Sequence, residues 1–456
     1  MFIGREKELA ELKEHLTANK KAAVLVYGKR RIGKSALIEE AAKNFKGILI
    51  NHLFARTSYE GNLALLCRSV SLALNLPSST SFATIFDLFD FLKEQNKNIL
   101  VVLDEYQYFK ESLKSGEVDS YMQAVVDSLP ANIKIVFCGS YITTMKELLQ
   151  ESNPLFGRFT KVLHIEEFDY YDAARFCPSL PEYEKIRFFA VFGGSPYVLT
   201  NLDYSKTLED NIKTLLIDQN SLLRTYIENI MLREIQKAYD IRILEVLGNG
   251  KKKYREIQSI LGMQDSGLLD KQLKNLIAME TVVKTEPINK IGDKKKQFYE
   301  IKDNLMRFYF TYIFANDSLI KKFGEDEFFN LLIGISLKTF VSLRFESMVI
   351  QYFMRQARAG KLKGVLDFGS FWYDDAQTGT NMQFDCVLKD SSGYDFFEVK
   401  FYEKPMKKAE CVQEEKQVRQ QLALLCNKIG FVCSAGFTFK SDNYELISAK
   451  KMYSSR

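Results

Sequence analysis

The segment GKRRIGKS, residues 28–35, constrains the fold most strongly because it joins an apolar run to a helical pattern. AAVLVY precedes it and ALIEEAAKNF follows it. The pattern G-x-x-x-x-G-K-S between a strand and a helix is typical of a loop whose backbone N–H groups wrap phosphates. We therefore predict a nucleotide site, with Lys34 on the β- and γ-phosphates and Ser35 on Mg²⁺. The residues assigned to the nucleotide are Gly28, Arg31, Ile32, Gly33, Lys34, Ser35 and Ala36.

The surrounding pattern favours a parallel sheet. Apolar runs rich in Val, Ile and Leu occur at 22–28, 47–54, 98–105, 133–140 and 161–168, and helix-length segments separate them. Continuous apolar strands of this kind are typical of a sheet that helices cover on both faces. We expect a three-layer α/β domain in this part of the chain.

Acids and a hydroxyl follow two of these runs. Asp104 and Glu105 end one strand, so Asp104 is predicted to hold Mg²⁺ and Glu105 to polarise the attacking water. The same pair of acids could instead cap the next helix. Ser140 ends the following strand and is a candidate sensor of the γ-phosphate, or a helix cap.

Two further segments carry candidate residues. Arg158, in NPLFGRFT, could act as an arginine finger on its own nucleotide or on a neighbour's, and a solvated loop arginine is the alternative. The turn GGSPYVL, with Gly193, Gly194 and Pro196, could abut the adenine or could end one helix and start another.

The middle of the chain is helical and then basic. Residues 204–239 show a helical period and predict a connector. Residues 241–302 then predict three helices and a hairpin, the order of a winged helix-turn-helix, with Leu268, Leu269, Leu273 and Leu276 on the inner face of the third helix. Residues 241–300 hold twelve Lys and Arg against eight Asp and Glu. Lysines at 271, 274 and 294–296 could neutralise DNA phosphates, or the wing could be a protein contact surface.

The last region predicts a small α/β domain with a second chemical site. Asp385 lies on NMQFDCVL, and Glu398 and Lys400 share one face of YDFFEVKF because strand side chains alternate. Two carboxylates and the Val399 carbonyl would hold Mg²⁺, with Lys400 positioning or activating a water against a phosphodiester. This resembles the D…E-x-K core of restriction-like nucleases, which implies that Glu346 matches the acid on their first helix. A solvated strand edge or an ion pair is the alternative.

Several motifs together identify a family. FIGREKEL at residues 2–9, GKRRIGKS, LDEYQYF, FCGS, PLFGR and GGSPY occur in that order. The chain thereby resembles the archaeal-type ATPases among the P-loop proteins, relatives of the signal-transducing AAA+ class, over nearly its full length. The resemblance implies an ATPase core, a winged helix and a C-terminal domain of unknown function. It also implies that Ile3 and Gly4 lie against the adenine.

The composition indicates the broad class of protein to which the chain belongs. The 456 residues, 46% hydrophobic and 27% charged, are typical of a folded protein of about three domains. No apolar run approaches the roughly 20 residues of a membrane span, and the N-terminus lacks a signal-peptide pattern, so we expect a cytoplasmic protein without a membrane partner. The seven cysteines form no C-x-x-C pair and the three histidines are widely spaced, so carboxylates should hold any metal.

These observations predict a mixed α/β protein. It has a P-loop three-layer ATPase domain with a helical connector (1–235), a winged helix (236–302) and a restriction-nuclease-like α/β domain (303–456). The expected function is binding and slow hydrolysis of ATP with Mg²⁺, which would switch the domains around DNA and could license metal-dependent cleavage. The alternative is a nucleotide-controlled regulator or scaffold, with an inert last domain.

A P-loop small-molecule kinase is a third class. It is disfavoured because Glu105 follows the Mg²⁺ aspartate and no arginine-rich lid precedes the winged helix. The protein could also form a homo-oligomer.

Overall fold

The computed structural model describes residues 2–114, 116–232, 240–264, 266–375, 380–422 and 426–454. The chain divides into two compact units, Met1–Glu167 and Phe168–Arg456. The predicted boundaries at 235 and 302 both fall within the second unit, and the three-domain division stays a prediction.

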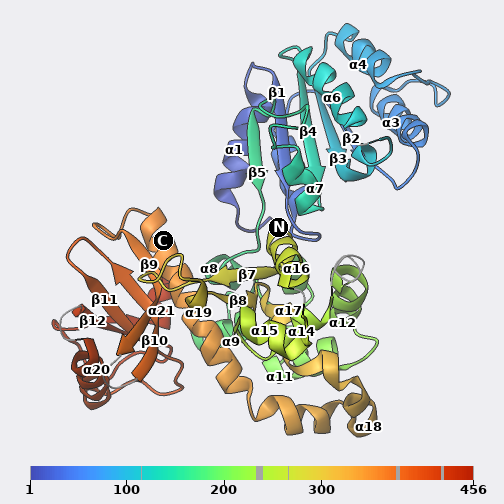
Figure 1. Ribbon diagram of the computed structural model, residues 1–456. Coiled ribbons are helices and arrows are strands. Elements are labelled where there is room, and N and C mark those ends of the chain that lie inside the picture. The colour runs from blue at the N-terminus through green and yellow to red at the C-terminus, as the bar shows by residue number, and fades with distance from the viewer. Residues whose placement is uncertain are drawn as a thin grey trace. The chain divides into compact units, whose positions relative to one another are not determined.

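The first unit contains the predicted parallel sheet. Its five strands lie in the order β2-β3-β4-β1-β5, and every neighbouring pair is parallel (Figure 1). The strands are β1 (Ala22–Tyr27), β2 (Ile48–Leu53), β3 (Ile99–Asp104), β4 (Ile133–Gly139) and β5 (Lys161–His164). β1, the N-terminal five residues of β3 and all of β4 are buried, which is why these segments read as continuous apolar runs.

Helices cover both faces of this sheet. One face packs against α1 and α2, and the other packs against α3, α4, α5, α6 and α7. The helices are α1 (Glu6–Thr17), α2 (Lys34–Ala42), α3 (Tyr59–Leu74), α4 (Ile85–Glu94), α5 (Tyr106–Lys110), α6 (Glu117–Asp127) and α7 (Ile142–Glu147). The predicted three-layer α/β arrangement is confirmed, and it places the loop after β1 and the acids after β3 at the carboxyl edge of the sheet.

The second unit begins with helices. They are α8 (Tyr170–Ala173), η1 (Ala174–Phe176), α9 (Glu182–Phe192), α10 (Pro196–Thr200), α11 (Leu208–Ile212), η2 (Lys213–Ile217), α12 (Leu222–Tyr226) and η3 (Ile227–Met231). The GGSPY turn ends α9 at Gly193 and starts α10 with Pro196 in its first turn. Gly194 is required because a Cβ there would lie 1.9 Å from the carbonyl oxygen of Phe168.

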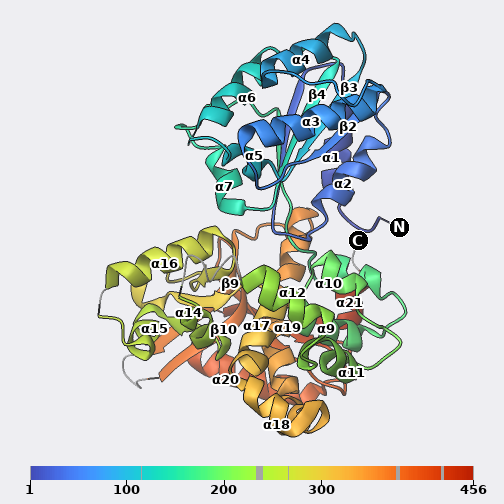
Figure 2. The same cartoon turned by 90° about the vertical axis from the view of Figure 1, so that its right-hand side faces the viewer.

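Three helices and a hairpin follow in the predicted order (Figure 2). They are α14 (Arg242–Gly248), β6 (Lys252–Lys253), α15 (Tyr254–Leu261), α16 (Ser266–Ala278), β7 (Val282–Thr285), η4 (Lys294–Lys296) and β8 (Phe298–Ile301). The strands form an antiparallel sheet in the order β6-β8-β7. Leu269, Leu273 and Leu276 of α16 are buried as expected. The prediction for Leu268 was wrong: it is 48% exposed, because it lies one step round the helix from the buried stripe.

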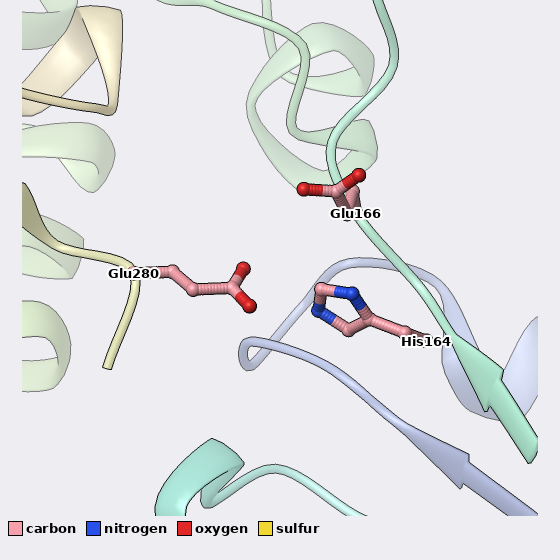
Figure 3. Close-up of side chains that lie close together, drawn as sticks. All are labelled: His164, Glu166 and Glu280. Carbon is pink, nitrogen blue, oxygen red and sulfur yellow. The ribbon is translucent and has the colours of Figure 1, made fainter. Parts of the chain in front are cut away.

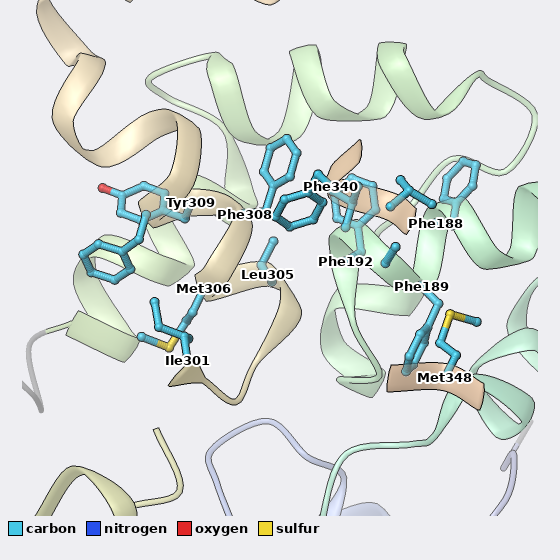
Figure 4. Packing of buried hydrophobic residues seen from close by; sticks show 14 of the residues in the cluster. Phe188, Phe189, Phe192, Ile301, Leu305, Met306, Phe308, Tyr309, Phe340 and Met348 are labelled. Atoms are coloured by element: carbon cyan, nitrogen blue, oxygen red, sulfur yellow. The ribbon is translucent and has the colours of Figure 1, made fainter. Parts of the chain in front are cut away.

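Long helices connect this part to the C-terminal sheet. They are α17 (Asn304–Phe308), η5 (Tyr309–Ile313), η6 (Phe314–Asn316), α18 (Asp317–Phe328), η7 (Phe329–Gly334) and α19 (Leu337–Arg358). Aromatic side chains fill the space between α9, α17 and α19, including Phe188, Phe192, Phe308 and Phe340 (Figure 4). Among the described residues no single helix is long and apolar enough to span a membrane, although the bent pair 304–334 and 337–358 passes by length and composition.

The last sheet is mixed. Its order is β13-β12-β11-β10-β9, with antiparallel pairs β9/β10 and β10/β11 and parallel pairs β11/β12 and β12/β13. The elements are β9 (Asp367–Asp375), β10 (Thr380–Lys389), β11 (Tyr394–Lys400), α20 (Lys408–Leu422), β12 (Cys426–Cys433), β13 (Glu445–Ser448) and α21 (Ala449–Ser454). α19 packs on one face and α20 on the other.

One core runs through the second unit. Buried side chains from the helices after Phe168, from α16, from β8 and from β11 all belong to the same cluster. The predicted winged helix and the predicted C-terminal domain therefore share apolar packing. This common core holds charged side chains that lie far apart in the sequence at defined distances from one another.

Candidate functional site

The loop after β1 adopts a conformation that requires its glycines. A Cβ on Gly28 would lie 2.1 Å from the carbonyl oxygen of Ile165. Gly33 has φ +90° and caps α2, a left-handed conformation that favours glycine. The loop therefore runs close to the backbone after β5 and delivers the chain directly into the N-terminus of α2. The exposed Ser35 and Ala36 occupy the first turn of that helix.

Lys34 is held inside this loop. Its Nζ donates to the carbonyl oxygens of Gly28 at 2.9 Å and of Lys29 at 2.8 Å, and the residue is only 7% exposed. Burial lowers the pKa of Lys34, while the charges of Glu105 and Asp104 act in the opposite direction. The ammonium is therefore poised at the helix N-terminus, where phosphate oxygens would replace its carbonyl acceptors.

Ser35 and Asp104 meet across the edge of the sheet. Ser35 Oγ donates to Asp104 Oδ2 at 2.9 Å, and Asp104 Oδ1 accepts from the backbone N–H of Glu105 at 2.9 Å. A hydroxyl and a carboxylate in contact supply the oxygen ligands that Mg²⁺ prefers. The two predicted Mg²⁺ ligands thus fit that ion together.

Glu105 is oriented by two side chains. Ser140 Oγ donates to Glu105 Oε2 at 2.7 Å, and the amide of Gln107 donates to the same oxygen and, at 3.2 Å, to Ser140 Oγ. Gln107 is fully buried. The predicted water-polarising acid and the predicted sensor are therefore in direct contact. Sequence reasoning missed Gln107, although it lies in the quoted motif LDEYQYF, two residues after Glu105.

A cluster of two arginines and two tyrosines lies beside these groups. Arg30 of the loop donates to the hydroxyl of Tyr108 at 2.6 Å and to that of Tyr141 at 3.4 Å. Arg56 donates to Tyr141 and lies 5.0 Å from the centre of the Tyr108 ring. Tyr141 follows Ser140 directly. The cluster places two guanidinium groups near the phosphate loop, and neither Arg30 nor Arg56 was among the predicted site residues.

The N-terminal segment is tied to the loop. Arg5 donates to the carbonyl oxygen of Ile32 at 3.0 Å and to that of Glu166 at 2.6 Å. The neighbouring Ile3 and Gly4 are thereby positioned beside the loop. Pro196, also assigned to the nucleotide, belongs to the second unit, where it starts α10.

Arg158 is not brought to this site. Its Nε is 3.1 Å from both carboxylate oxygens of Asp127. It precedes β5, and Thr160 donates its N–H to the carbonyl of Ala23 at the start of β1. Arg158 therefore lies at the amino edge of the sheet, whereas the phosphate loop follows the carboxyl end of β1, a strand of six residues that is about 20 Å long.

His164 and Glu166 lie at the end of β5 and are drawn with Glu280 in Figure 3. The His164 ring stacks on Tyr27, with 4.8 Å between the ring centres. Glu280 belongs to the second unit, so the three side chains are not assigned a common metal site.

The predicted C-terminal site residues come together within the second unit. Cys386 pairs with Phe397, so the next residues along the two strands, Asp385 and Glu398, lie opposite each other. The register of β10 against β9 shifts between Phe384 and Val387. Such a bulge changes the direction of the side chain at that point of the strand.

A third acid, Glu346, lies close enough to Asp385 and Glu398 to interact with their charges. Burial and the neighbouring carboxylates of Asp385 and Glu398 together raise the pKa of Glu346 to about 8, although the charge of Lys251 opposes this. Burial also raises the pKa of Glu398, although Lys400 opposes this. Glu346 projects from α19, which packs on β10 and β11. Ionising Glu346 beside two other carboxylates costs free energy. A divalent cation that neutralises the negative charge would therefore bind favourably between these three acids.

Lys400 is engaged by two acids. Its Nζ lies 2.7 Å from Glu398 Oε1 and 3.2 Å from Glu414 Oε1. Burial alone would lower the pKa of Lys400, but hydrogen bonds and charges from Glu398 and Glu414 raise it. A second lysine, Lys251, lies 3.6 Å from Asp385 Oδ1. Sequence reasoning missed Glu414 and Lys251, because helix α20 and the turn before β6 reach the site only in the folded chain.

Comparison with known proteins adds the following matches. Residues 2–202 match an ATPase domain predominantly from Archaea, and residues 309–414 match a region of archaeal and bacterial proteins of unknown function. An uncharacterized protein of Methanocaldococcus jannaschii is 30% identical over 385 residues, 82% of this chain and 82% of that protein. An uncharacterized ATP-binding protein of the same organism is 39% identical over 46 residues, 10% of this chain and 78% of that protein.

Two solved structures are also similar. The Walker-type ATPase of Pyrococcus abyssi matches over 68% of this chain and 96% of its own, with 20% identity and a TM-score of 0.48. The ORC2 protein of Aeropyrum pernix, solved as ADPNP–ADP complexes, matches over 70% of this chain and 94% of its own, with 14% identity and a TM-score of 0.48.

Proposed function

Because this chain belongs to the family of ATPases found predominantly in Archaea, we propose that it hydrolyses ATP slowly with Mg²⁺ and uses the nucleotide state to switch its domains around DNA. The contact of Ser35 with Asp104 beside the buried Lys34 carries the ATPase part of this proposal. The ATP-binding ATPase class follows from the family. The Mg²⁺ requirement, the switching and the action on DNA are the proposal.

Each residue of the proposed nucleotide site has a separate role in ATP hydrolysis. Lys34 binds the β- and γ-phosphate oxygens, and Ser35 and Asp104 would hold Mg²⁺, which neutralises phosphate charge when bound. Glu105 accepts a proton from the water that attacks the γ-phosphorus, and the bond to the departing ADP oxygen breaks. Ser140 and Gln107 keep the Glu105 carboxylate in place for that proton transfer.

The test is ATP binding and turnover by wild type and by Lys34→Ala. We expect Lys34→Ala to abolish hydrolysis, because no other side chain would supply the positive charge that Lys34 places at the β- and γ-phosphates. Lys43→Ala is the matched control, since Lys43 lies just past the other end of α2 and pairs on the surface with Glu40 at 2.6 Å. Wild-type protein that neither binds nor hydrolyses ATP with Mg²⁺, or an unchanged Lys34→Ala, would contradict the proposal.

A second activity is supported by the C-terminal acids. Asp385 lies opposite Glu398 and α19 places Glu346 beside them, which favours a metal-dependent site that cleaves a phosphodiester. Asp385, Glu398 and the Val399 carbonyl would supply oxygen ligands, and Glu346 a further one. Lys400 would orient the attacking water, consistent with its place beside Glu398.

DNA cleavage can be measured directly. Plasmid and linear DNA are incubated with wild type, Lys34→Ala and Lys400→Ala, with Mg²⁺ or Mn²⁺ and with or without ATP. Cleavage that is lost in Lys400→Ala and altered in Lys34→Ala supports a nuclease gated by ATP. No cleavage under any condition favours the regulator with an inert last domain, in which Asp385→Ala and Lys400→Ala leave function intact.

DNA binding is proposed for the elements between 242 and 301. Their order and their three-stranded sheet support a winged helix, and Lys271, Lys274 and the lysines of η4 are its proposed phosphate contacts. Lys274 already pairs with Asp270 at 2.7 Å, which weakens its candidacy. Homo-oligomer formation and a cytoplasmic location remain part of the proposal.

A further inference from the structure

Three lysines of the proposed winged helix surround a pair of aromatic rings. Phe298 of β8 and Trp372 of β9 stack with 6.1 Å between ring centres. Lys296 Nζ lies 3.8 Å from the centre of the Trp372 ring, and Lys253 Nζ lies 5.5 Å from both ring centres. Lys251 Nζ lies 5.8 Å from the Phe298 ring. The negative ring faces hold these ammonium groups at defined positions on the surface.

Hydrogen bonds to the backbone of β9 fix the arrangement of this cluster. Asn289, in the hairpin, accepts from the N–H of Trp372 at 2.9 Å and donates to its carbonyl at 2.8 Å. The N–H of Ile288 donates to the carbonyl of Ser370 at 2.8 Å. The hairpin is therefore fastened to the edge strand β9 of the C-terminal sheet. The lysines and the rings therefore lie on one continuous surface that spans the hairpin and β9.

The same surface continues to the acidic site. Lys251 Nζ lies 3.6 Å from Asp385 Oδ1, and the two side chains are 40% and 36% exposed. Asp385 interacts in turn with Glu346. A row of cations thus ends at the carboxylates. Carboxylates alone repel a polyanion, so a neighbouring row of cations supplies the attraction that would bring a phosphodiester to them.

We propose that Lys251, Lys253 and Lys296 bind the phosphodiester backbone of a DNA strand and lead it to Glu346, Asp385 and Glu398. This inference rests on the proposed action on DNA and names the surface that carries it. Recognition is through charge, so it depends on salt and little on sequence. Lys251 exchanges its partner Asp385 for a phosphate when the strand binds, which frees that carboxylate for a cation.

The binding experiment uses the full chain in EDTA without ATP, so that neither cleavage nor hydrolysis contributes. A labelled single-stranded oligonucleotide and its duplex are titrated by fluorescence anisotropy over a range of salt concentrations. The chain has one tryptophan, so the emission of Trp372 reports independently on binding at this cluster. The variants are Lys253→Gln with Lys296→Gln, Lys253→Arg with Lys296→Arg, and Lys206→Gln as a surface control, which removes a lysine 3.7 Å from Asp203.

We expect the double glutamine variant to bind at least about tenfold more weakly and to lower the slope of log K against log salt by about 1 to 2, since roughly 0.7 to 0.9 is lost per phosphate contact. The double arginine variant and Lys206→Gln should bind as wild type does. Preference for either the single strand or the duplex identifies which form of DNA the surface takes.

Other outcomes overturn the inference. If the double glutamine variant binds with unchanged affinity and salt slope, DNA binds elsewhere on the protein, and the proposed action on DNA still stands. If an RNA oligonucleotide of the same length binds more tightly than DNA, the assignment to DNA is wrong. If wild type binds no DNA at all, both this inference and the proposed action on DNA are wrong. The proposed ATPase activity is tested separately, by the ATP hydrolysis assay with Lys34→Ala.

Discussion

At the scale of single residues, the proposed nucleotide site is a set of short contacts around the ends of β1, β3 and β4. Lys34 and Ser35 follow from the phosphate-loop pattern, and Asp104 and Glu105 from their position after a buried strand. The structure adds the contact of Ser140 with Glu105, which depends on β4 lying between β3 and β1. Gln107 completes this group because α5 begins immediately after Glu105.

Gln107 is predicted to be a positioning residue. In Gln107→Ala, Glu105 loses one of its two side-chain donors, and a hydrogen bond to a charged group is worth about 1.5 to 3 kcal/mol, so kcat should fall at least about tenfold with little change in KM. In Gln107→Glu, two carboxyl groups share the site and one tends to keep a proton, so the acidic limb of the kcat profile should move to higher pH. Steady-state ATPase measurements over pH check both results.

Gln150→Ala is the matched control, since Gln150 is exposed after α7. A Gln107→Ala variant with wild-type kcat would show that Ser140 alone positions Glu105. A Gln107→Glu variant with an unchanged pH profile would show that residue 107 does not act on the acid.

His52 makes stability depend on pH. Burial in β2 lowers the pKa of His52 to about 4. The unfolded chain, with a pKa of about 6.5, therefore binds the proton more readily than the folded chain. The contribution of neutral His52 is complete above pH 6.5 and is lost as the pH falls toward 4, with an upper limit of about 3 kcal/mol.

Denaturant unfolding at pH 7.5 and pH 4.5 checks this expectation. His52→Gln should be less stable than wild type at pH 7.5 because its packing is poorer, and it should lose less stability on acidification. His15→Gln, in α1, is the control. An equal loss in wild type and His52→Gln would assign the acid sensitivity to other groups.

At the scale of elements, α19 and the β10/β11 pair create the acidic site. α19 places Glu346 against a strand pair whose register sets Asp385 opposite Glu398. Strand alternation predicted the shared face of Glu398 and Lys400, and the resemblance to nucleases supplied Glu346. No pattern in the sequence indicates the bulge in β10 or the contact of Glu414 with Lys400.

Glu346 should oppose folding at alkaline pH. Its pKa, raised to about 8, means that the folded chain resists ionisation, so the cost is absent below about pH 4.5 and complete above about pH 8. Glu346→Gln should therefore raise the unfolding temperature of the second unit at pH 8.5 in EDTA and change it little at pH 5. The emission of Trp372 follows unfolding of this unit specifically.

Mn²⁺ provides the complementary measurement. The ion should raise the unfolding temperature of wild type at pH 8.5, because it offsets the carboxylate charges, and should raise that of Glu346→Gln less. Glu403→Gln, an exposed acid that pairs with Lys338 at 3.2 Å, is the control. An equal response of all three proteins to Mn²⁺ would place the ion elsewhere.

At the scale of the whole molecule, the proposed ATPase and the proposed action on DNA belong to different units. The first unit holds the nucleotide groups, and the second holds the acidic site and the basic surface. The expected ATPase, winged-helix and C-terminal regions follow one another in sequence, yet the last two share one apolar core. This shared core is why Lys251 can meet Asp385 across more than a hundred residues of chain.

An arginine-finger role of Arg158 can be tested between chains. It lies at the sheet edge opposite its own phosphate loop, so a finger role requires a second copy. A mixture of Lys34→Ala, which keeps Arg158, with Arg158→Ala, which keeps an intact phosphate loop, should recover ATPase activity that neither variant has alone. Turnover per chain should also rise with protein concentration.

Arg175→Ala is the control, since Arg175 belongs to the second unit and lies 3.5 Å from Asp172 in an ion pair. Absence of recovery in the mixture, with each variant folded, would remove the finger role. Full activity of Arg158→Ala alone would do the same, and the pair with Asp127 would then be structural.

The sequence by itself determined the parallel α/β core, the phosphate loop and its acids, because buried strands require continuous apolar runs and a phosphate loop requires glycines at fixed spacing. It also indicated the order of elements in the second unit. Only the tertiary structure decided the partners of Glu105, the place of Arg158, the exposure of Leu268 and the junction of Lys251 with Asp385. Those depend on strand order, helix rotation and the packing of distant segments, which local patterns in a chain do not record.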